Sequence, residues 1–460
     1  MNWLNQQIEK QPEKPFIQSD KKVWSYLDIS EMVELHSKAL LKSGVKKQDK
    51  VLIFLPSSIE MVEIILSCIN LGAISVPIDD KLTKNELDLI LEYVKPSIII
   101  TNWGKKDIFS IVDKTILYIE ELPFSASGCG NYDNSYKMLD SDICAIILTS
   151  GTTGPPKAVE LTYKNFKVSC ANWNLLLNFE VKDQFLCCLP LSHIGGFAVL
   201  LRALIYGFSI HLVNKFQAEK IYDIINLSSI TIISLVPTML SRIIKLNNGI
   251  ASLKSLRYIL LGGGPSHENL LDTCIKEKLP IIKVYGMTET CSGTFGLKLL
   301  EEPESKLYAG RPFPGLKVKI ISDEIHVSGP MVMNGYLGKE KIVGGFNTRD
   351  VGYMKNGLLF LEMRRKDIII SGGKNINPIE IENHLIGIDG VDDAAVVGEH
   401  DNEWGQKVVA YIVYQATVIK EDSIKLRLKN KISSYKIPKS FIKVDKIPRN
   451  ELGKIKYDEL

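Results

Sequence analysis

The 460-residue chain is longer than one hydrophobic core usually supports, so we expect two or more domains. Its hydrophobic content of 45% and charged content of 24% are ordinary for a soluble globular protein. Lys and Arg number 56 against 53 Asp and Glu, which gives a formal net charge of +3 at pH 7. This balance argues against nucleic acid or an anionic membrane as the main partner.

The sequence carries no pattern typical of secretion or of a membrane span. Its start, "MNWLNQQIEKQPEKPF", lacks the basic segment and apolar core of a secretory signal. The most apolar stretch, "FAVLLRALIYGFSIHLV", is interrupted by Arg202 and His211, which favours a buried helix followed by a strand. We therefore expect a cytoplasmic protein with no membrane partner.

The cysteines point to the same compartment. They form no CxxC motif and no Cys/His cluster, and most stand in apolar surroundings. This pattern predicts reduced thiols in a cytoplasmic protein, and no side-chain constellation indicates a resident metal. The eight cysteines are Cys68, Cys129, Cys144, Cys170, Cys187, Cys188, Cys274 and Cys291.

The first 140 residues alternate strand and helix patterns. "VLIFLPSS" predicts a buried strand, and "IEMVEIILSCINLGA" predicts an amphipathic helix that ends at a glycine. Such alternation is the signature of parallel α/β layers. A second alternating series follows: "QFLCCLP", "FAVLLRALIYG", "SIHLV", "AEKIYDIINLS", "TIISLVP", "LRYILLGGG" and "IIKVYG".

Two further regions complete the expected organisation. Residues 309–362 contain short strands and turns, which predicts a small β-barrel-like subdomain. A tail with its own apolar series follows "MRRKD", so we place a domain boundary at Lys366. The predicted fold is α/β: a large domain (1–365) of two layered α/β subdomains plus the β-rich part, and a small mobile α+β domain (366–460).

The segment "LTSGTTGPPKAVELT" combines glycines and hydroxyls around Lys157, directly after the apolar strand run "ICAIILT". Glycine lets backbone N–H groups approach phosphate oxygens closely, and the lysine adds a positive charge. The segment is not a Walker A loop, because Pro156 stands at its second glycine and Ala158 replaces its Ser or Thr. The alternative reading is a polar surface turn. We expect a phosphate-binding loop of another kind.

This segment closely resembles the phosphate loop of the adenylate-forming superfamily, which includes acyl-CoA synthetases, peptide-synthetase adenylation domains and luciferases. Other motifs of that superfamily follow in order: "LPLSHIGGF", "ILLGGGPS", "YGMTETCSG", "FNTRDVGY", "MRRKD", "SGGKN" and "KIPRNELGKIK". The resemblance covers essentially the whole chain and implies ATP, Mg²⁺ and CoA as ligands. For the phosphates of ATP it implies contacts from Thr149, Ser150, Gly151, Thr152, Thr153, Gly154 and Lys157.

The resemblance also assigns roles beyond the phosphate loop. Thr288 would contact the α-phosphate and Glu289 would bind Mg²⁺, a pairing that suits a hard oxygen-ligand site. His193 would gate the acyl pocket. The C-terminal Lys454 would contact the reacting carboxylate, although a solvated basic tail is the alternative reading. The nucleotide-binding residues would further include Gly262, Gly263, Gly264, Tyr285, Gly286, Asp350 and Arg364, and the hinge of the small domain would lie at Lys366.

Two positions depart from the family pattern. Arg349 replaces the glycine that normally precedes the ribose-binding Asp350, and Met363 stands where an Asp or Gly usually precedes Arg364. A residue other than glycine at position 349 pays a conformational cost if that position requires a positive φ. These changes put the local ribose geometry in doubt and leave the class unaffected.

Four segments carry a narrower resemblance: "LPLSHIGGFAVLLRALIYGFSIHLVNKFQAEKI", "SLVPTML", "LLGGGPS" and "YGMTETCS". Together they resemble the o-succinylbenzoate–CoA ligases of menaquinone biosynthesis, whose substrate is a dicarboxylate. Arg202 within an apolar helix requires a partner, because burying an unpaired charge is costly. That partner is either a structural counter-ion or the second carboxylate of the substrate. The candidate substrate residues are Arg202, Arg242, Ser234 and Thr238, with Arg202 preferred.

Other readings stay open at this point. The chain could be another aryl or short-to-medium-chain acyl-CoA ligase, or an enzyme that loads a carrier protein. A catalytically silent nucleotide sensor of the same fold belongs to a different functional class, and the presence of Lys157, Glu289, Asp350 and Lys454 argues against it. A homo-oligomer is possible on this sequence.

Overall fold

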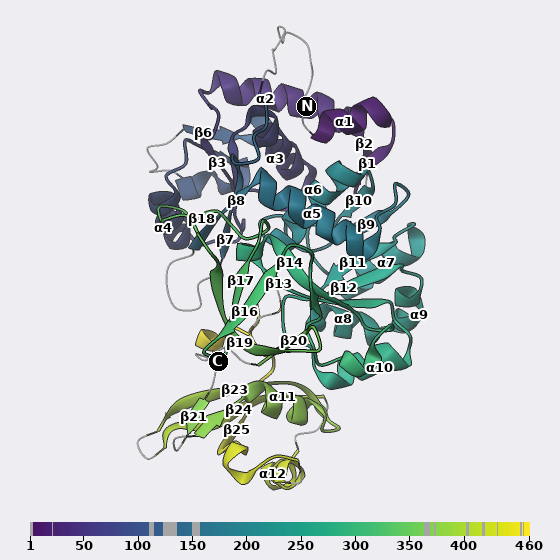
Figure 1. The fold of residues 1–460 in the computed structure, drawn as a ribbon, viewed down its shortest axis with the longest axis vertical. Helices are drawn as coiled ribbons and strands as arrows, with labels where there is room; N and C mark the ends of the chain where they lie inside the picture. Colours follow the sequence, from purple (N-terminus) through teal and green to yellow (C-terminus); the bar gives the residue numbers. More distant parts are fainter. Residues whose placement is uncertain are drawn as a thin grey trace.

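The structure is a computed structural model (Figure 1), and it shows a large upper body with a smaller domain below it. The described residues are 3–20, 22–109, 115–122, 136–149, 157–362, 369–371, 374–401, 404–415, 419–429, 431–450, 453 and 455–460.

A nine-stranded sheet forms the centre of the large domain. Strands β9 to β13 run parallel to one another, whereas β14 and β15 add antiparallel strands at one edge. In spatial order the strands are β15 (Arg311–Pro312), β14 (Ser292–Lys298), β13 (Ile281–Met287), β12 (Tyr258–Leu261), β11 (Ile232–Leu235), β9 (Gln184–Cys187), β10 (Ser209–Leu212), β1 (Pro15–Gln18) and β2 (Val23–Ser25).

A second, seven-stranded sheet lies beside it and carries the first predicted α/β series. Its strands in spatial order are β18 (Gly335–Tyr336), β8 (Lys157–Thr162), β7 (Ile143–Thr149), β4 (Ile74–Pro77), β3 (Lys50–Ile53), β5 (Ile98–Thr101) and β6 (Thr115–Tyr118). The helices of the large domain are α1 (Trp3–Lys10), α2 (Tyr26–Lys42), α3 (Ile59–Leu71), α4 (Lys84–Val94), α5 (Tyr163–Leu177), α6 (Ile194–Tyr206), α7 (Ala218–Leu227), α8 (Pro237–Ile244), α9 (Gly249–Lys254) and α10 (Glu268–Lys276).

Helices α3, α5 and α6 contribute to one core that joins the two sheets, because side chains of both sheets and of these helices share a single buried cluster. The stretch that might have suggested a membrane span is α6 followed by β10, as predicted. No helix in the described part of the chain is both long and apolar enough to span a bilayer. The seven cysteines that the structure describes are buried and free of disulfides, and Cys129 lies outside the described residues.

The β-rich region forms a four-stranded antiparallel sheet with its own buried cluster. Its strands are β16 (Lys317–Ile321), β17 (Glu324–Ser328), β19 (Phe346–Lys355) and β20 (Leu358–Leu361). Strand β18 instead leaves this region and pairs with β8 at the edge of the seven-stranded sheet. This exchange brings the chain after residue 330 next to the end of the phosphate loop.

The small domain has a separate hydrophobic cluster formed from residues 369 to 437. Its helices α11 (Pro378–Ile386) and α12 (Glu421–Lys429) accompany one sheet, which matches the predicted α+β class. The strands of that sheet are β22 (Lys374–Ile376), β21 (Ile369–Ser371), β24 (Gly405–Tyr414), β23 (Val391–Asp401) and β25 (Ser440–Lys443). The boundary at Lys366 stays a prediction, since residues 363–368 lie outside the described part.

Polar contacts connect the small domain to the large one at α8 and α10. Lys245 Nζ lies 2.7 Å from Asp392 Oδ1, and the ring Nδ1 of His267 bonds the side-chain oxygen of Asn383. Both small-domain partners come from the α11–β23 unit. The small domain is therefore docked below the carboxyl ends of the parallel strands.

A buried titratable pair between α2 and α3 generates a prediction about stability. His36 Nδ1 lies 3.7 Å from Glu63 Oε2, and both side chains are almost fully buried. Burial raises the pKa of Glu63 to about 8 and lowers the pKa of His36 to about 4. At acid pH the two groups change the free energy of unfolding in opposite directions: as the pH rises, the contribution of Glu63 falls and that of His36 grows. Above the ordinary His pKa of 6.5, only Glu63 still takes up protons on folding, and that stabilisation is lost as the pH rises through 8.

The substitution Glu63→Gln should therefore make the thermal midpoint fall less between pH 6.5 and 8.5 than it does in the parent, because the amide cannot ionise. The effect at pH 8.5 should reach at least about 1.4 kcal/mol, the equivalent of one pKa unit. Thermal unfolding followed by circular dichroism at both pH values measures it. The exposed Glu31→Gln on α2 is the control and should leave the pH dependence unchanged. Parallel pH profiles for parent and Glu63→Gln would contradict the burial argument.

Candidate active site

The site is built where the parallel strands of the central sheet end. Strands β9, β11, β12 and β13 share one direction, so their carboxyl ends meet along one edge. This is the edge at which open α/β sheets bind ligands. The segments "VPTML" and "GGGPS" directly follow β11 and β12, "LPLSH" begins two residues after the end of β9, and "YGMTET" starts within β13 and continues past its end.

The turn after β13 carries Thr288 and Glu289 in a short 3₁₀ helix, Thr288–Thr290. The turn is tight because β13 passes directly into β14: a Cβ on Gly286 would stand 2.1 Å from the Ser292 carbonyl oxygen. Cys291 and Ser292 both adopt positive φ, at 53° and 87°, which is uncommon for residues other than glycine. The surrounding structure must therefore hold this turn in place.

Arg202 stabilises the strained turn through a hydrogen bond to Ser292. Its Nη2 donates to Ser292 Oγ over 3.0 Å, and its guanidinium carbon lies 4.4 Å from the centre of the Trp173 ring. The residue is 2% exposed, and burial lowers the pKa of Arg202 to about 10, so it stays cationic at neutral pH. Among the described residues no carboxylate pairs with Arg202, and its Nε has no hydrogen-bond partner. The structural ion pair considered above is thus absent from this part of the chain.

Lys157 and Glu289 are brought together by a residue that the sequence analysis did not single out, Tyr336. The phenol of Tyr336 donates to Glu289 Oε1 over 2.8 Å, and Lys157 Nζ lies 5.2 Å from the centre of the same ring. Thr149 opposes Lys157 in the β7–β8 ladder, and its hydroxyl donates to the Lys157 carbonyl. The end of the phosphate loop therefore adjoins the predicted magnesium ligand.

The side chains around Glu289 fit a metal that arrives with a nucleotide. No group of three or more His, Cys, Asp or Glu side chains in the described residues could hold an ion by itself. Mg²⁺ in phosphoryl-transfer sites is held by one or two carboxylates, substrate phosphates and water. The single carboxylate of Glu289 beside the cation of Lys157 matches that donor set, and in Mg²⁺-bound ATP the ion neutralises phosphate charge.

Tyr285 and Asp350, the two residues predicted to contact adenine and ribose, are joined directly. The Tyr285 hydroxyl donates to Asp350 Oδ2 over 2.6 Å, and the backbone N–H of Asp350 donates to Thr348 Oγ1. The Asp350 side chain, which accepts this hydrogen bond, is largely buried. Arg349 has φ of 61°, so the position does require the left-handed conformation that the family glycine accommodates without cost. Its backbone N–H donates to Asn347 Oδ1, which fixes the turn.

The glycine segment after β12 is shaped for close approach. A Cβ on Gly262 would stand 2.5 Å from Val284 Cγ2, directly beside Tyr285, and Gly263 has φ of 80°. Nothing lies within 4 Å of a Cβ built on Gly264. The segment thus packs tightly at its first residue and leaves space at its third, as a surface for a flat ring requires.

The candidate acid-binding residues occupy the ends of β9 and β11. His193 is the N-cap of α6, and Gly196 in the first turn of that helix leaves no room for a side chain against the Pro190 carbonyl. Ser234 on β11 and Thr238 in the first turn of α8 are half-buried. Strand order places β11 two positions from β13, so these polar groups share the edge that carries Thr288.

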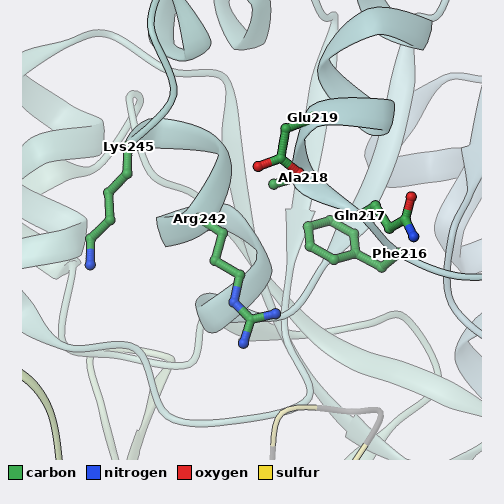
Figure 2. A pocket seen from close by; sticks show the side chains of 6 residues that line it. All are labelled: Phe216, Gln217, Ala218, Glu219, Arg242 and Lys245. Atoms are coloured by element: carbon green, nitrogen blue, oxygen red, sulfur yellow. The ribbon is translucent and has the colours of Figure 1, made fainter. Parts of the chain in front are cut away.

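Arg242 lies elsewhere. Its side chain is exposed one turn further along α8 and lines an open surface pocket of about 370 Å³ (Figure 2). In this view the side chains of Arg242 and Lys245 both extend downward from the end of this helix, and Phe216 lies beside Arg242. The remaining lining residues are Gln217, Ala218 and Glu219. Of the two arginines, Arg202 alone contacts the turn that carries Thr288 and Glu289.

Several predicted site residues fall outside the described part of the chain. These are Ser150, Gly151, Thr152, Thr153, Gly154, Arg364, Lys366 and Lys454. The roles assigned to them stay predictions. The residue before Lys454 is described, however: a Cβ on Gly453 would stand 2.7 Å from Thr238 Oγ1. The C-terminal motif therefore reaches the edge of the large domain that carries the candidate residue Thr238.

Two residues that matter here lacked a sequence signal strong enough to identify them. Tyr336 stands in the turn segment "NGYLG", which has no charged or metal-ligating pattern. Ser292 is the last polar residue of "TETCS", and nothing in its spacing reveals the positive φ or the contact with Arg202. In both cases the partner is distant in sequence, so only the fold brings them together.

Comparison with known families and structures identifies the family of this chain. The family model for the AMP-binding enzyme matches residues 4–337, and that for the AMP-binding enzyme C-terminal domain matches residues 380–454. The chain is 34% identical to a 2-succinylbenzoate–CoA ligase of Listeria monocytogenes, over 100% of this chain and 98% of that one.

Solved structures give the same result. An o-succinylbenzoate CoA synthetase from Bacillus subtilis in complex with its acyl-adenylate intermediate is similar with a TM-score of 0.91 and 32% identity, over 100% of this chain and 97% of that one. The same enzyme in complex with ATP and magnesium ion has a TM-score of 0.89 and 32% identity, over 100% and 99% of the two chains. The chain therefore belongs to the AMP-binding enzymes, the adenylate-forming superfamily of ATP-dependent acyl-CoA ligases.

Proposed function

We propose that this ligase acts on 2-succinylbenzoate and forms 2-succinylbenzoyl-CoA, AMP and diphosphate, the thioester-forming step of menaquinone biosynthesis. The observation that carries the proposal is the buried Arg202, which has no carboxylate partner among the described residues and stands behind the half-buried Ser292. The names of the similar ligases agree with this substrate.

The geometry of the Arg202–Ser292 pair suits a second carboxylate on the substrate. Because Ser292 Oγ accepts from Arg202 Nη2, its own hydroxyl hydrogen is available to another acceptor. The cation behind the hydroxyl favours an anionic acceptor, and its field is strong because the guanidinium is buried. Ser292 would thus donate to the ring carboxylate of 2-succinylbenzoate, with Arg202 supplying the charge. Ser234 and Thr238 would line the acid pocket, and His193 would stand at its entrance.

In the first half-reaction the succinyl carboxylate attacks the α-phosphorus of ATP, and the bond to diphosphate breaks to give the acyl-adenylate. The protein positions the reactants and stabilises phosphoryl charge, since this step requires little covalent chemistry from side chains. Lys157 and Thr149 would hold the phosphates with the glycines of the loop, and Thr288 would contact the α-phosphate. Tyr285 and Asp350 would hold the nucleoside.

In the second half-reaction the CoA thiol attacks the acyl carbon of the adenylate, and AMP leaves with the bonding electron pair. We assign Lys454 to the first half-reaction, where its cation would contact the carboxylate and the nucleotide. The small domain would then turn about Lys366 and carry the "SGGKN" segment towards the acyl group. CoA is a co-substrate in this scheme, and ATP with Mg²⁺ serves the first step only.

The first test compares acids that differ by one carboxylate. With 4-oxo-4-phenylbutyrate, which keeps the succinyl chain and lacks the ring carboxylate, kcat/KM for diphosphate release should fall roughly 10- to 100-fold relative to 2-succinylbenzoate, because a charged hydrogen bond is lost. Ser292→Ala should lower kcat/KM more for 2-succinylbenzoate than for the analogue, because both acids share the loss of the hydrogen bond that supports the turn and only 2-succinylbenzoate also loses the contact to its ring carboxylate. Diphosphate release and mass detection of the thioester measure both.

Equal kcat/KM values for the two acids would exclude a second-carboxylate site and favour another aryl or acyl-CoA ligase. If a carrier protein replaced CoA as the acceptor, adenylate would form and CoA thioester would not. Failure of every acid in a panel to release diphosphate would favour the nucleotide sensor.

A second prediction concerns Tyr336. The change Tyr336→Phe removes the hydroxyl that orients Glu289 and keeps the ring beside Lys157. Loss of such an outer hydrogen bond should raise the Mg²⁺ concentration for half-maximal adenylate formation about 10-fold. Tyr93→Phe is the matched control, because the Tyr93 hydroxyl donates to the neighbouring Leu337 carbonyl and does not touch Glu289. If the Mg²⁺ dependence of Tyr336→Phe is unchanged, Tyr336 does not orient Glu289.

A third prediction separates the half-reactions. Lys454→Ala should lower adenylate formation on the order of 10²–10³-fold, as expected for loss of one preorganised charged group. Thioester formation from supplied acyl-adenylate and CoA should stay within about threefold of the parent, since the lysine has no role there in this scheme. Rapid-quench measurement of each half-reaction decides the matter, and an equal loss in both would contradict the assignment.

A further inference from the structure

Two adjacent acids on β23, Asp392 and Asp393, hold different parts of the molecule. Asp392 pairs with Lys245 of the large domain, whereas Asp393 pairs with Arg449 near the C-terminus. The Arg449 contact is a fork: Nη2 lies 2.8 Å from Asp393 Oδ1, and Nε lies 3.3 Å from Oδ2. The backbone N–H of Ala394 donates to the same Oδ1 over 2.9 Å, so the carboxylate itself is fixed.

Arg449 also closes a turn in the C-terminal motif. Its third nitrogen, Nη1, donates to the Gly453 carbonyl over 3.0 Å, and its backbone pairs with Ile455 in an antiparallel bridge. The Gly453 N–H donates to the Asn450 carbonyl over 2.9 Å, which tightens the same turn. One guanidinium thus connects the sheet of the small domain to both the start and the end of this segment.

The turn is held against the large domain at a place that admits no side chain. Gly453 has φ of 72°, and a Cβ built on it would lie 2.7 Å from Thr238 Oγ1 and 3.1 Å from Val236 Cγ2. Val236 and Thr238 follow β11 at the acid-binding edge. The next residue in the chain is Lys454.

From these contacts we infer that Asp393 and Arg449 are positioning residues for the adenylation half-reaction. Their ion pair holds the turn that ends at Gly453 against Val236 and Thr238, and so sets where the chain enters Lys454. The inference rests on the proposed role of Lys454 in the first half-reaction.

The pair differs from an ordinary surface ion pair. The Arg449 and Asp393 side chains are only 17% and 28% exposed, and the fork geometry cannot be reproduced by an ammonium. The neighbouring Lys245–Asp392 pair is 57% and 42% exposed and has a single contact. Exposed pairs of that kind contribute little. We therefore expect loss of the Arg449–Asp393 pair to impair adenylation and loss of the Lys245–Asp392 pair to have little effect, although the two acids are adjacent in sequence.

The experiment measures both half-reactions in Asp393→Ala and Arg449→Lys, with any acid that the parent enzyme accepts. Misplacing a reacting group by about 1 Å costs on the order of 10²-fold, so adenylate formation should fall roughly 10- to 100-fold in kcat. Thioester formation from supplied acyl-adenylate should stay within about threefold. A positioning effect gives this split, whereas general destabilisation would lower both rates and the thermal midpoint.

Two matched controls remove other ion pairs, one from the sheet of the small domain and one from the contact between the domains. Glu399→Gln removes a charge from the pair between Glu399 on β23 and Lys407 on β24, and Lys245→Ala removes the interdomain pair. Both variants should keep both half-reactions within about threefold of the parent. A loss of adenylation in Glu399→Gln equal to that in Arg449→Lys would overturn the inference.

The double variant Arg449→Lys with Lys454→Ala tests whether the two residues act together. If Arg449 acts through Lys454, the double variant should form adenylate no more slowly than Lys454→Ala alone. Additive losses would overturn the inference. Normal adenylation by Lys454→Ala would refute the proposed function of that lysine. If Lys454→Ala loses adenylation but Asp393→Ala and Arg449→Lys keep normal rates, only the positioning role is refuted.

Discussion

The buried guanidinium of Arg202 is the constraint on which the active-site turn depends. It stacks on Trp173 and donates to Ser292, whose φ of 87° would be unfavourable in an unsupported loop. The turn it holds carries Thr288 and Glu289. One hydrogen bond from this cation thus supports the turn that carries Thr288 and Glu289 and leaves the hydroxyl hydrogen of Ser292 for another acceptor.

Beyond that turn, the other candidate nucleotide-binding residues form two short chains of contacting side chains. One passes from Glu289 through Tyr336 to Lys157, and so joins the end of the phosphate loop to the 3₁₀ helix. The other runs from Tyr285 to Asp350, and joins the central sheet to the β-rich subdomain. Three sheets therefore contribute to one edge, and the crossing of β18 onto β8 is what makes the first chain possible.

Much of this arrangement could be predicted from the sequence, because it depends on local pattern and motif order. The α/β layers, the β-rich region and the α6–β10 stretch follow from hydrophobic periodicity. For Arg349 the sequence raised only the condition of a positive φ, and the structure has φ of 61° there. The partners of Arg202 and Glu289 could not be predicted, since Ser292 and Tyr336 are 90 and 47 residues away along the chain. Local propensity carries no information about such contacts.

The contacts between the two domains differ from those within the small domain, and this difference affects how the small domain could change position. Among the described residues the domains meet at the exposed Lys245–Asp392 pair, at the part-buried His267–Asn383 hydrogen bond, and where Gly453 packs against Val236 and Thr238. Interfaces of this polar kind permit relative motion of domains. The Asp393–Arg449 fork lies wholly within the small domain. In the rotation proposed above, the turn that ends at Gly453 would therefore move with the small domain and keep its contacts to Arg449.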